Sequence, residues 1–267
     1  MKDMVALYVQ QFKTTFASMV QYRASLLIWM IGQVLEPLIY LIVWSAVSTT
    51  SGGSVGSYTT RDFAGYFIVL MLVNQFSYTW IMYEFEYRVR EGLLSFALLK
   101  PVNPIHFHIA DNLSSKLITL PVMALIAIGL AAAFQPSISP QTWAVMVFIP
   151  VIMMAFIVRF LLEWTLALAA FWTTRVNAIN QAYFVLMLFL SGQIAPLALM
   201  PLPVRVLADI LPFRWVIAFP VELLLGKLNP ADALIGLGAQ AVWLVVGFIL
   251  VRIVWKSGIK VYSAVGA

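Results

Sequence analysis

The chain has 267 residues, of which 63% are hydrophobic and only 10% are charged. A soluble domain is usually about half apolar and about a quarter charged, so this composition excludes an ordinary soluble protein and indicates an integral membrane protein. The net charge of +5 does not indicate nucleic-acid binding, because the basic residues are scattered, and the absence of cysteine excludes disulfides and thiolate metal sites.

Residues 1–22 have the pattern of an amphipathic helix. Apolar side chains recur at helical spacing, and Gln10, Thr14, Ala17 and Gln21 fall on the opposite face. This pattern predicts a helix that lies in the cytoplasmic interface of the membrane. The sequence leaves open whether this helix moves during function or is only an anchor.

Six later segments are apolar and long enough to cross a bilayer, which takes about 20 residues. They are residues 24–47, 63–83, 117–134, 142–172, 179–198 and 233–255. Their loops alternate in basic charge, and the positive-inside rule then places both termini in the cytoplasm. The predicted fold is an all-α membrane protein in which residues 1–267 form a single domain with six transmembrane helices.

The cytoplasmic segment 85–104 contains a short apolar helix that cannot span the membrane. Pro101 and Pro104 are expected to end it. Its predicted apolar face, suited to a partner helix or groove, comprises Leu93, Leu94, Ala97 and Leu98. Its predicted charged rim comprises Arg88, Arg90, Glu91 and Lys100. The alternative is a membrane-surface helix that has no partner.

The external segment 199–227 is apolar and divided by prolines. Residues 204–211 and 213–225 each begin after a proline, as the first turn of a helix allows, and each is too short to span. We therefore expect two short re-entrant helices that dip into the outer leaflet and pack against the bundle. The alternative is an ordinary surface loop with interfacial helices.

Away from their ends, the predicted spans contain three charged residues. Arg159 and Glu163 are four residues apart, so they share one helix face and are expected to pair. Such a pair could fix helix packing or form a polar patch at a pathway or subunit interface. Glu36, directly before Pro37, has no evident partner in the sequence and is the better candidate for a functional role.

The order of these features resembles the permease subunits of ABC-2 type ATP-binding-cassette transporters, and more narrowly the bacterial permeases associated with drug or toxic-compound efflux. The resemblance extends over essentially the whole chain. It is seen locally in two stretches: Arg90-Glu91-Gly92-Leu93-Leu94 through Lys100-Pro101, and Ser191-Gly192-Gln193-Ile194-Ala195-Pro196 through Leu202-Pro203 and Leu211-Pro212.

The resemblance implies an exporter subunit in the bacterial cytoplasmic membrane that moves a hydrophobic or amphipathic substrate outward. Segment 85–104 would be a coupling helix that docks on an ATP-binding subunit, present in two copies. A second permease, identical or homologous, would complete the pathway. The chain has no G-x-x-x-x-G-K-[ST] loop, so ATP and Mg²⁺ are expected in the partner, with no cofactor or catalytic residue in this chain.

In such a permease the first, second and fifth spans would line the pathway. The polar candidates there are Glu36, Asn74, Gln75 and Gln193. Two other readings remain open: a secondary transporter, although the halves show no internal repeat, and a membrane-embedded enzyme, although the intramembrane charges form no recognised catalytic set. ATP dependence with a partner subunit would separate the first reading from both.

Overall fold

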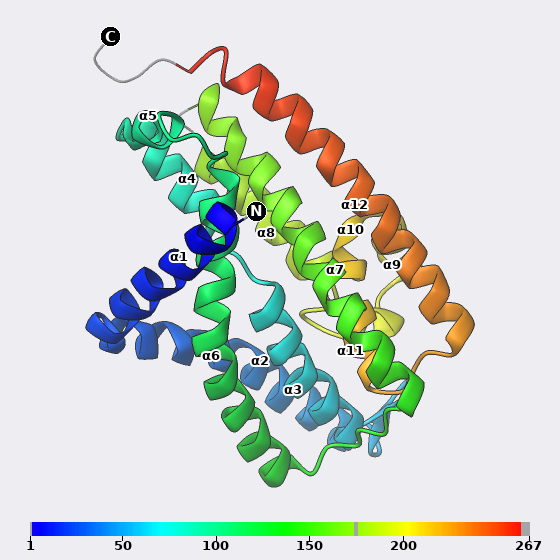
Figure 1. The fold of residues 1–267 in the computed structure, drawn as a ribbon. Helices are drawn as coiled ribbons and strands as arrows, with labels where there is room; N and C mark the ends of the chain where they lie inside the picture. The colour runs from blue at the N-terminus through cyan, green and yellow to red at the C-terminus, as the bar shows by residue number, and fades with distance from the viewer. Residues whose placement is uncertain (1, 174–175, 263–267) are drawn as a thin grey trace.

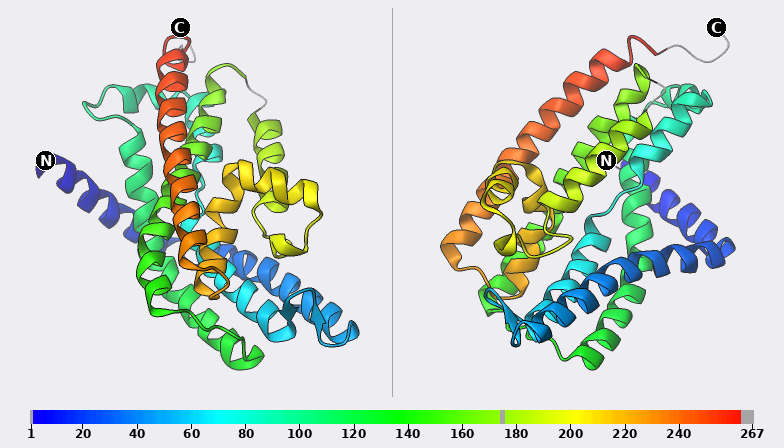
Figure 2. Two further views of the ribbon diagram at one scale, coloured as in Figure 1. Left: turned by 90° about the vertical axis from the view of Figure 1, so that its right-hand side faces the viewer. Right: turned by 180° about the vertical axis from the view of Figure 1, so that it is seen from behind.

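The computed structural model describes residues 2–173 and 176–262, arranged as Figures 1 and 2 show. Helices dominate, which confirms the all-α prediction. The elements in chain order are α1 (Lys2–Gln21), α2 (Arg23–Thr50), β1 (Ser54–Val55), β2 (Tyr58–Thr59), α3 (Thr60–Ser77), α4 (Ile81–Arg90), α5 (Leu93–Leu98), α6 (Ile105–Phe134), α7 (Thr142–Ala167), η1 (Leu168–Phe171), α8 (Val176–Leu190), η2 (Leu197–Leu199), α9 (Leu202–Ile210), α10 (Pro212–Val216), α11 (Ala218–Leu224) and α12 (Pro230–Gly258).

Among the described residues, 5 segments are long and apolar enough to cross a membrane. They are α2, α3 with α4, α6, α7 with η1, and α12. Each overlaps one predicted span, although α6 begins at Ile105 rather than at residue 117. The chain is therefore a multi-pass membrane protein.

The predicted fifth span, 179–198, differs most from the structure. Its helix, α8, has only 15 residues and ends at Leu190, which is short of the roughly 20 residues that a spanning helix needs. The chain then turns at Gly192, whose φ of 87° lies in the left-handed region. The hydroxyl of Tyr66 donates a 2.8 Å hydrogen bond to the Gly192 carbonyl and fixes the turn.

Helix α3 lies at the centre of the bundle. It contacts α2, α6, α7 and α11, and its side chains are buried on almost every side. A helix that is apolar all round is stable when it is enclosed in this way. By contrast, α2, α6 and α12 leave long rows of apolar side chains exposed, as is expected where helices face lipid or another subunit.

The external segment forms three short helices, α9, α10 and α11, rather than the two that we predicted. Helices α10 and α11 pack against α7, and α11 also packs against α3. Their side chains are largely buried, so this segment belongs to the core of the domain. The expectation that it packs against the bundle is thus met by the contacts.

Helix α5 lies at one end of the molecule, beside the C-terminal end of α12, while the β1–β2 hairpin and the end of α6 lie at the opposite end (Figure 1). Helix α1 runs across α6 (Figures 1 and 2), and the two are in contact. The side chains of Thr15 and Asp111 join them through a 2.6 Å hydrogen bond.

Candidate functional site: a polar helix break joined to a surface helix

The second spanning segment is interrupted between α3 and α4. Helix α3 ends at Ser77 and α4 begins at Ile81. A helix end leaves carbonyl groups without intrahelical partners, and such groups need other donors when they are buried. The Lys116 ammonium from α6 supplies one of these donors through a 2.6 Å hydrogen bond to the Tyr78 carbonyl.

An ion pair from α7 lies beside this break. Arg159 Nε donates to Glu163 Oε1 at 2.8 Å, and the two residues are only 2% and 0% exposed. The structure thus pairs these residues as their spacing predicts. Because the pair is withdrawn from water, its stability depends on further hydrogen bonds that offset the desolvation of both charges.

Those further bonds come from α8, from the end of α3 and from the break itself. Arg159 Nη1 donates to the Asn74 side-chain oxygen at 2.8 Å and to the Ser77 hydroxyl at 3.1 Å. The Thr79 hydroxyl donates to Glu163, and the Tyr183 hydroxyl donates to it at 3.2 Å. We call this set the polar junction: Asn74, Ser77, Thr79, Arg159, Glu163 and Tyr183. It ties α3, the break, α7 and α8 together.

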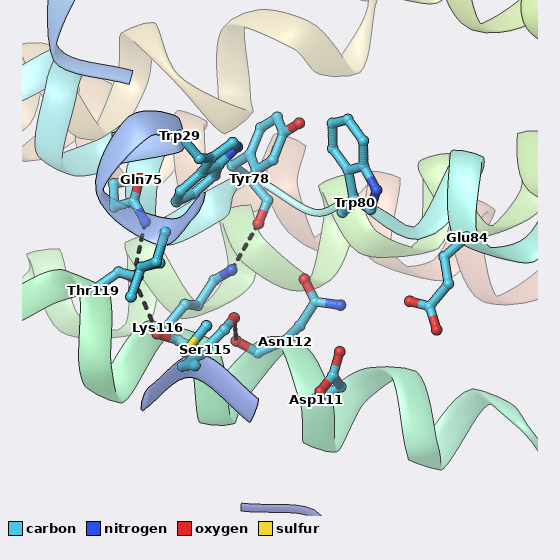
Figure 3. Close-up of a pocket in the computed structure, with 12 residues that line it drawn as sticks. Trp29, Gln75, Tyr78, Trp80, Glu84, Asp111, Asn112, Ser115, Lys116 and Thr119 are labelled. Atoms are coloured by element: carbon cyan, nitrogen blue, oxygen red, sulfur yellow. Dashed lines mark hydrogen bonds between the residues drawn. The ribbon is translucent and has the colours of Figure 1, made fainter. Parts of the chain in front are cut away.

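A cavity of about 260 Å³ opens next to the break, between α1, α2 and α6 (Figure 3). Aromatic rings of Trp29, Tyr78 and Trp80 line it together with polar side chains of α6. Gln75 also lines it, and its amide donates a 2.9 Å hydrogen bond to Thr119. The structure therefore places the predicted pathway residues differently: Asn74 joins the polar junction and Gln75 faces this cavity.

Beyond the break, α4 leads to α5 through Gly92, which adopts a left-handed φ of 70°. The observed face of α5 corrects our prediction. Leu94 is 1% exposed and packs inside its own chain, and Ala97 and Leu98 are half-buried. The apolar side chains that point outward are those of Leu93, Phe96 and Leu99, bordered by exposed Arg90, Glu91 and Lys100.

Aromatic contacts connect α4 with α7. The Phe85 ring lies 5.1 Å from the Trp164 ring and 5.6 Å from the Phe171 ring, measured between centroids. Trp164 directly follows Glu163 of the polar junction. The Ser95 hydroxyl of α5 also lies 2.9 Å from the Tyr262 hydroxyl, after α12. Packed side chains therefore connect α4 with the helix that carries Arg159 and Glu163.

Glu36 and Gln193 lie apart from the polar junction. Glu36 is exposed on α2, and no ion pair to it is found in the described part of the chain. Gln193 is half-buried in the irregular segment after α8, where Trp44 Nε1 donates to the neighbouring Ile194 carbonyl at 2.8 Å. The structure thus does not bring the four predicted pathway residues together within one chain.

A second polar cluster, which the sequence did not reveal, lies on the outer segment. Arg214 of α10 pairs with Asp209 and, at 3.4 Å, with Glu222 of α11. Burial raises the pKa of the Glu222 carboxyl above its ordinary value, and the nearby Arg214 opposes this shift. Lys116 was also missed, because its position at the start of a predicted span marks it only as a cytoplasmic charge.

The comparisons with known proteins agree with the architecture. A family model described as ABC-2 family transporter protein matches residues 34–266, most of the chain. A search of curated proteins found no match.

Proposed function

Because the chain belongs to the ABC-2 transporter family, we propose that it is the membrane subunit of an ATP-driven exporter. Members of this family are transport subunits of the membrane, are not themselves catalytic, and normally work with an ATP-binding subunit. In our proposal, a hydrophobic or amphipathic substrate moves outward with energy from a separate ATPase, and this ATPase holds the ATP and Mg²⁺.

The observation that carries the proposed coupling is the exposed face of α5. Phe96 and Leu99 are 67% and 83% exposed at the end of the molecule. Large apolar side chains surrounded by charges are typical of the centre of a protein interface. We propose that Leu93, Phe96 and Leu99 contact the ATPase, with Arg90, Glu91 and Lys100 at the rim.

In the proposed mechanism, movement passes from α5 through α4 to α7 by way of the side-chain contacts described above. Closure of two ATP-binding subunits moves α5, and the Phe85 contacts pass this movement from α4 to α7. The break at residues 78–80 separates α4 from α3, so α4 can shift while α3 stays enclosed in the bundle. The polar junction then offers alternative hydrogen-bond partners at the end of α3 and in the break itself, as a two-state element requires.

We further propose a second permease, identical or homologous. Glu36 supports this, because a charge exposed to lipid at mid-membrane costs about 2.5–3.5 kcal/mol on insertion scales, and a partner or a polar pathway would remove that cost. The pathway would then run past Glu36 and Gln193 between the two permeases, whereas Asn74, Gln75, Arg159 and Glu163 form its inner support.

The orientation is part of the same proposal. Both termini lie in the cytoplasm of a bacterial cell and the chain crosses its inner membrane six times, with α8 and the irregular segment after it forming the short fifth crossing. Helix α1 lies in the cytoplasmic interface, and α9 to α11 are re-entrant from outside. The apolar surface of the outer segment supports the last assignment, since Leu202 and Ile210 are each 64% exposed.

The test is to replace Phe96 and Leu99 with Asp and purify the tagged chain in mild detergent from its native membrane. An aromatic anchor at an interface commonly contributes about 2 kcal/mol or more, so the loss of Phe96 alone should weaken ATPase binding by about 30-fold, and the double variant should weaken it at least as much. Val261→Asp is the matched control, because Val261 is 55% exposed and outside α5, and it directly precedes Tyr262, whose hydroxyl lies 2.9 Å from that of Ser95.

If the double variant keeps its ATPase subunit and its ATP hydrolysis, the proposed docking face is wrong. If the unaltered chain purifies without any ATPase, under conditions that keep other membrane complexes intact, the exporter proposal itself fails. Leu94→Asp would not be informative, because a carboxylate at this buried position would unfold the segment.

A further inference from the structure

Two cavities lie one after the other along α2 and α6, and we call the space between these helices the α2–α6 groove. The first is the polar cavity of Figure 3, which reaches Leu26 and Trp29 on α2 and Thr119 on α6. The second has a volume of about 310 Å³ and is lined only by apolar side chains: Leu27, Met30, Ile31, Val34, Leu35, Val122 and Ile126. Each helix contributes neighbouring turns to both, so the groove is polar at one end and apolar at the other.

The polar end contains groups with unused hydrogen-bonding capacity. Lys116 is 5% exposed and uses one N–H for the Tyr78 carbonyl, and no carboxylate lies within ion-pair distance of it in the part of the chain that is described. The Gln75 side-chain oxygen is buried without any hydrogen-bond partner. Because a buried cation and a buried acceptor both border this cavity, we expect a polar ligand in the cavity to supply their missing hydrogen-bond partners.

The rim of the polar end carries a negative charge, on Asp111, opposite in sign to that of Lys116. Asp111 accepts hydrogen bonds from Thr15 and Gln11 on the same oxygen, Oδ1, and makes no ion pair among the described residues. It lies five residues before Lys116 on α6, closer to the cytoplasmic end proposed above. The exposed ring of Trp80 lines the same cavity and can face a cation.

The dimensions of the groove match one leaflet of a bilayer. Ten residues separate Lys116 from Ile126 on α6, and at 1.5 Å per residue they extend about 15 Å, half of the roughly 30 Å hydrocarbon core. The apolar part lies on the side of Lys116 that faces the middle of the membrane. A lipid of the cytoplasmic leaflet would therefore have its headgroup and its chains in the matching parts of the groove.

We propose that the α2–α6 groove binds one phospholipid with an ammonium-bearing zwitterionic headgroup. The phosphate accepts hydrogen bonds from Lys116, the ammonium lies against Asp111 and Trp80, the Gln75 oxygen accepts from the headgroup, and an acyl chain fills the apolar cavity past Val122. The proposal goes beyond the proposed function, because it concerns binding alone and holds with or without ATP-driven export.

The test measures lipid binding by native mass spectrometry on the full-length chain, delipidated in detergent and purified with any partner subunits. The probes are palmitoyl-oleoyl phosphatidylethanolamine, the phosphatidylglycerol with the same chains, and glycerophosphoethanolamine, which has no chains. Two variants test the two ends of the groove: Lys116→Gln removes the cation at the polar end, and Val122→Trp fills the apolar cavity. Their controls are Lys256→Gln, at an exposed lysine near the end of α12, and Leu125→Trp, which is 69% exposed and outside both cavities.

We expect one phosphatidylethanolamine to bind more tightly than phosphatidylglycerol, and each of Lys116→Gln and Val122→Trp to weaken it about tenfold. The controls should bind like the unaltered chain, and Asp111→Asn should remove the preference between the two lipids. Val122 is partly exposed, so this variant should fold even if Lys116→Gln does not.

Three results would overturn the proposal. Equal binding by the unaltered chain and Val122→Trp would mean that only non-specific boundary lipid is present. Displacement by glycerophosphoethanolamine at equal concentration would show that the acyl chain does not contribute. Tighter binding of phosphatidylglycerol would show that the headgroup class is wrong.

Discussion

Replacing Arg159 with Met would leave the Glu163 carboxylate buried without its cation. Glu163 is 0% exposed and would keep only its hydrogen bonds from Thr79 and Tyr183. Removing one partner of a buried ion pair costs about 3–5 kcal/mol. This figure includes the loss of the hydrogen bonds from Arg159 to Asn74 and Ser77. We expect Arg159→Met, and likewise Glu163→Gln, to lower the free energy of unfolding by this amount.

The double variant Arg159→Met/Glu163→Gln separates the ion pair from its surroundings. A Gln side chain can still hydrogen-bond to both hydroxyls, with its oxygen accepting from one and its amide nitrogen donating to the other, and no uncompensated charge remains. The double variant should therefore be no less stable than either single variant, which corresponds to a coupling energy of about 3 kcal/mol between the two side chains.

The assay is reversible unfolding in mixed detergent micelles, followed by tryptophan fluorescence. Arg252→Met is the matched control, because Arg252 is exposed on α12. A loss below about 1 kcal/mol in Arg159→Met, or a double variant that shows the sum of both losses, would refute the reasoning. If the double variant is stable but does not transport, the pair has a role in function and does more than fix the packing.

Two further predictions concern the outer half. Gly192→Ala should lower the free energy of unfolding by about 2 kcal/mol or more, because a Cβ at φ 87° would lie 2.5 Å from the Tyr66 hydroxyl. The control, Gly129→Ala, adds a Cβ in open space on α6 and should cost nothing. Equal free energies of unfolding for the two variants would contradict this prediction. The second is a pH dependence. Because the folded pKa of Glu222 is raised above its ordinary value of 4.5, its contribution to stability is present below that pH and is lost as the pH rises through the folded pKa. Thermal unfolding of Glu222→Gln should lack this decline, and an unchanged pH profile would count against the assignment.

The spans were predictable from the sequence because bilayer thickness imposes a length on every apolar helix. The same rule did not predict that the helix within residues 179–198 ends at Leu190, because apolar composition continues past that point. Pro196 and Gly192 mark the turn, but the hydrogen bonds that hold it come from Trp44 and Tyr66 on other helices. The composition of a single segment does not record such long-range partners.

The face of α5 shows a related limit. Helical spacing correctly groups Leu94 and Leu98 on one side, but spacing does not tell whether that side meets the chain itself or another molecule. Contacts with residues far along the sequence decide it, as the Ser95–Tyr262 pair across 167 positions illustrates. The most exposed apolar residues, Phe96 and Leu99, lie outside the predicted face, and of that face only Leu93 is exposed.

The break at residues 78–80 left no signal in the sequence at all. Tyr78, Thr79 and Trp80 include neither glycine nor proline, the usual markers of an interrupted helix. The interruption is stabilised instead by groups from other helices, since Lys116 binds the freed carbonyl and Glu163 accepts from Thr79. A break that depends on two buried charges, rather than on the local backbone, can close or shift when those charges change partners. The headgroup proposed for the α2–α6 groove would bind the same Lys116 that holds the Tyr78 carbonyl, so we expect lipid binding to be linked to the position of α4.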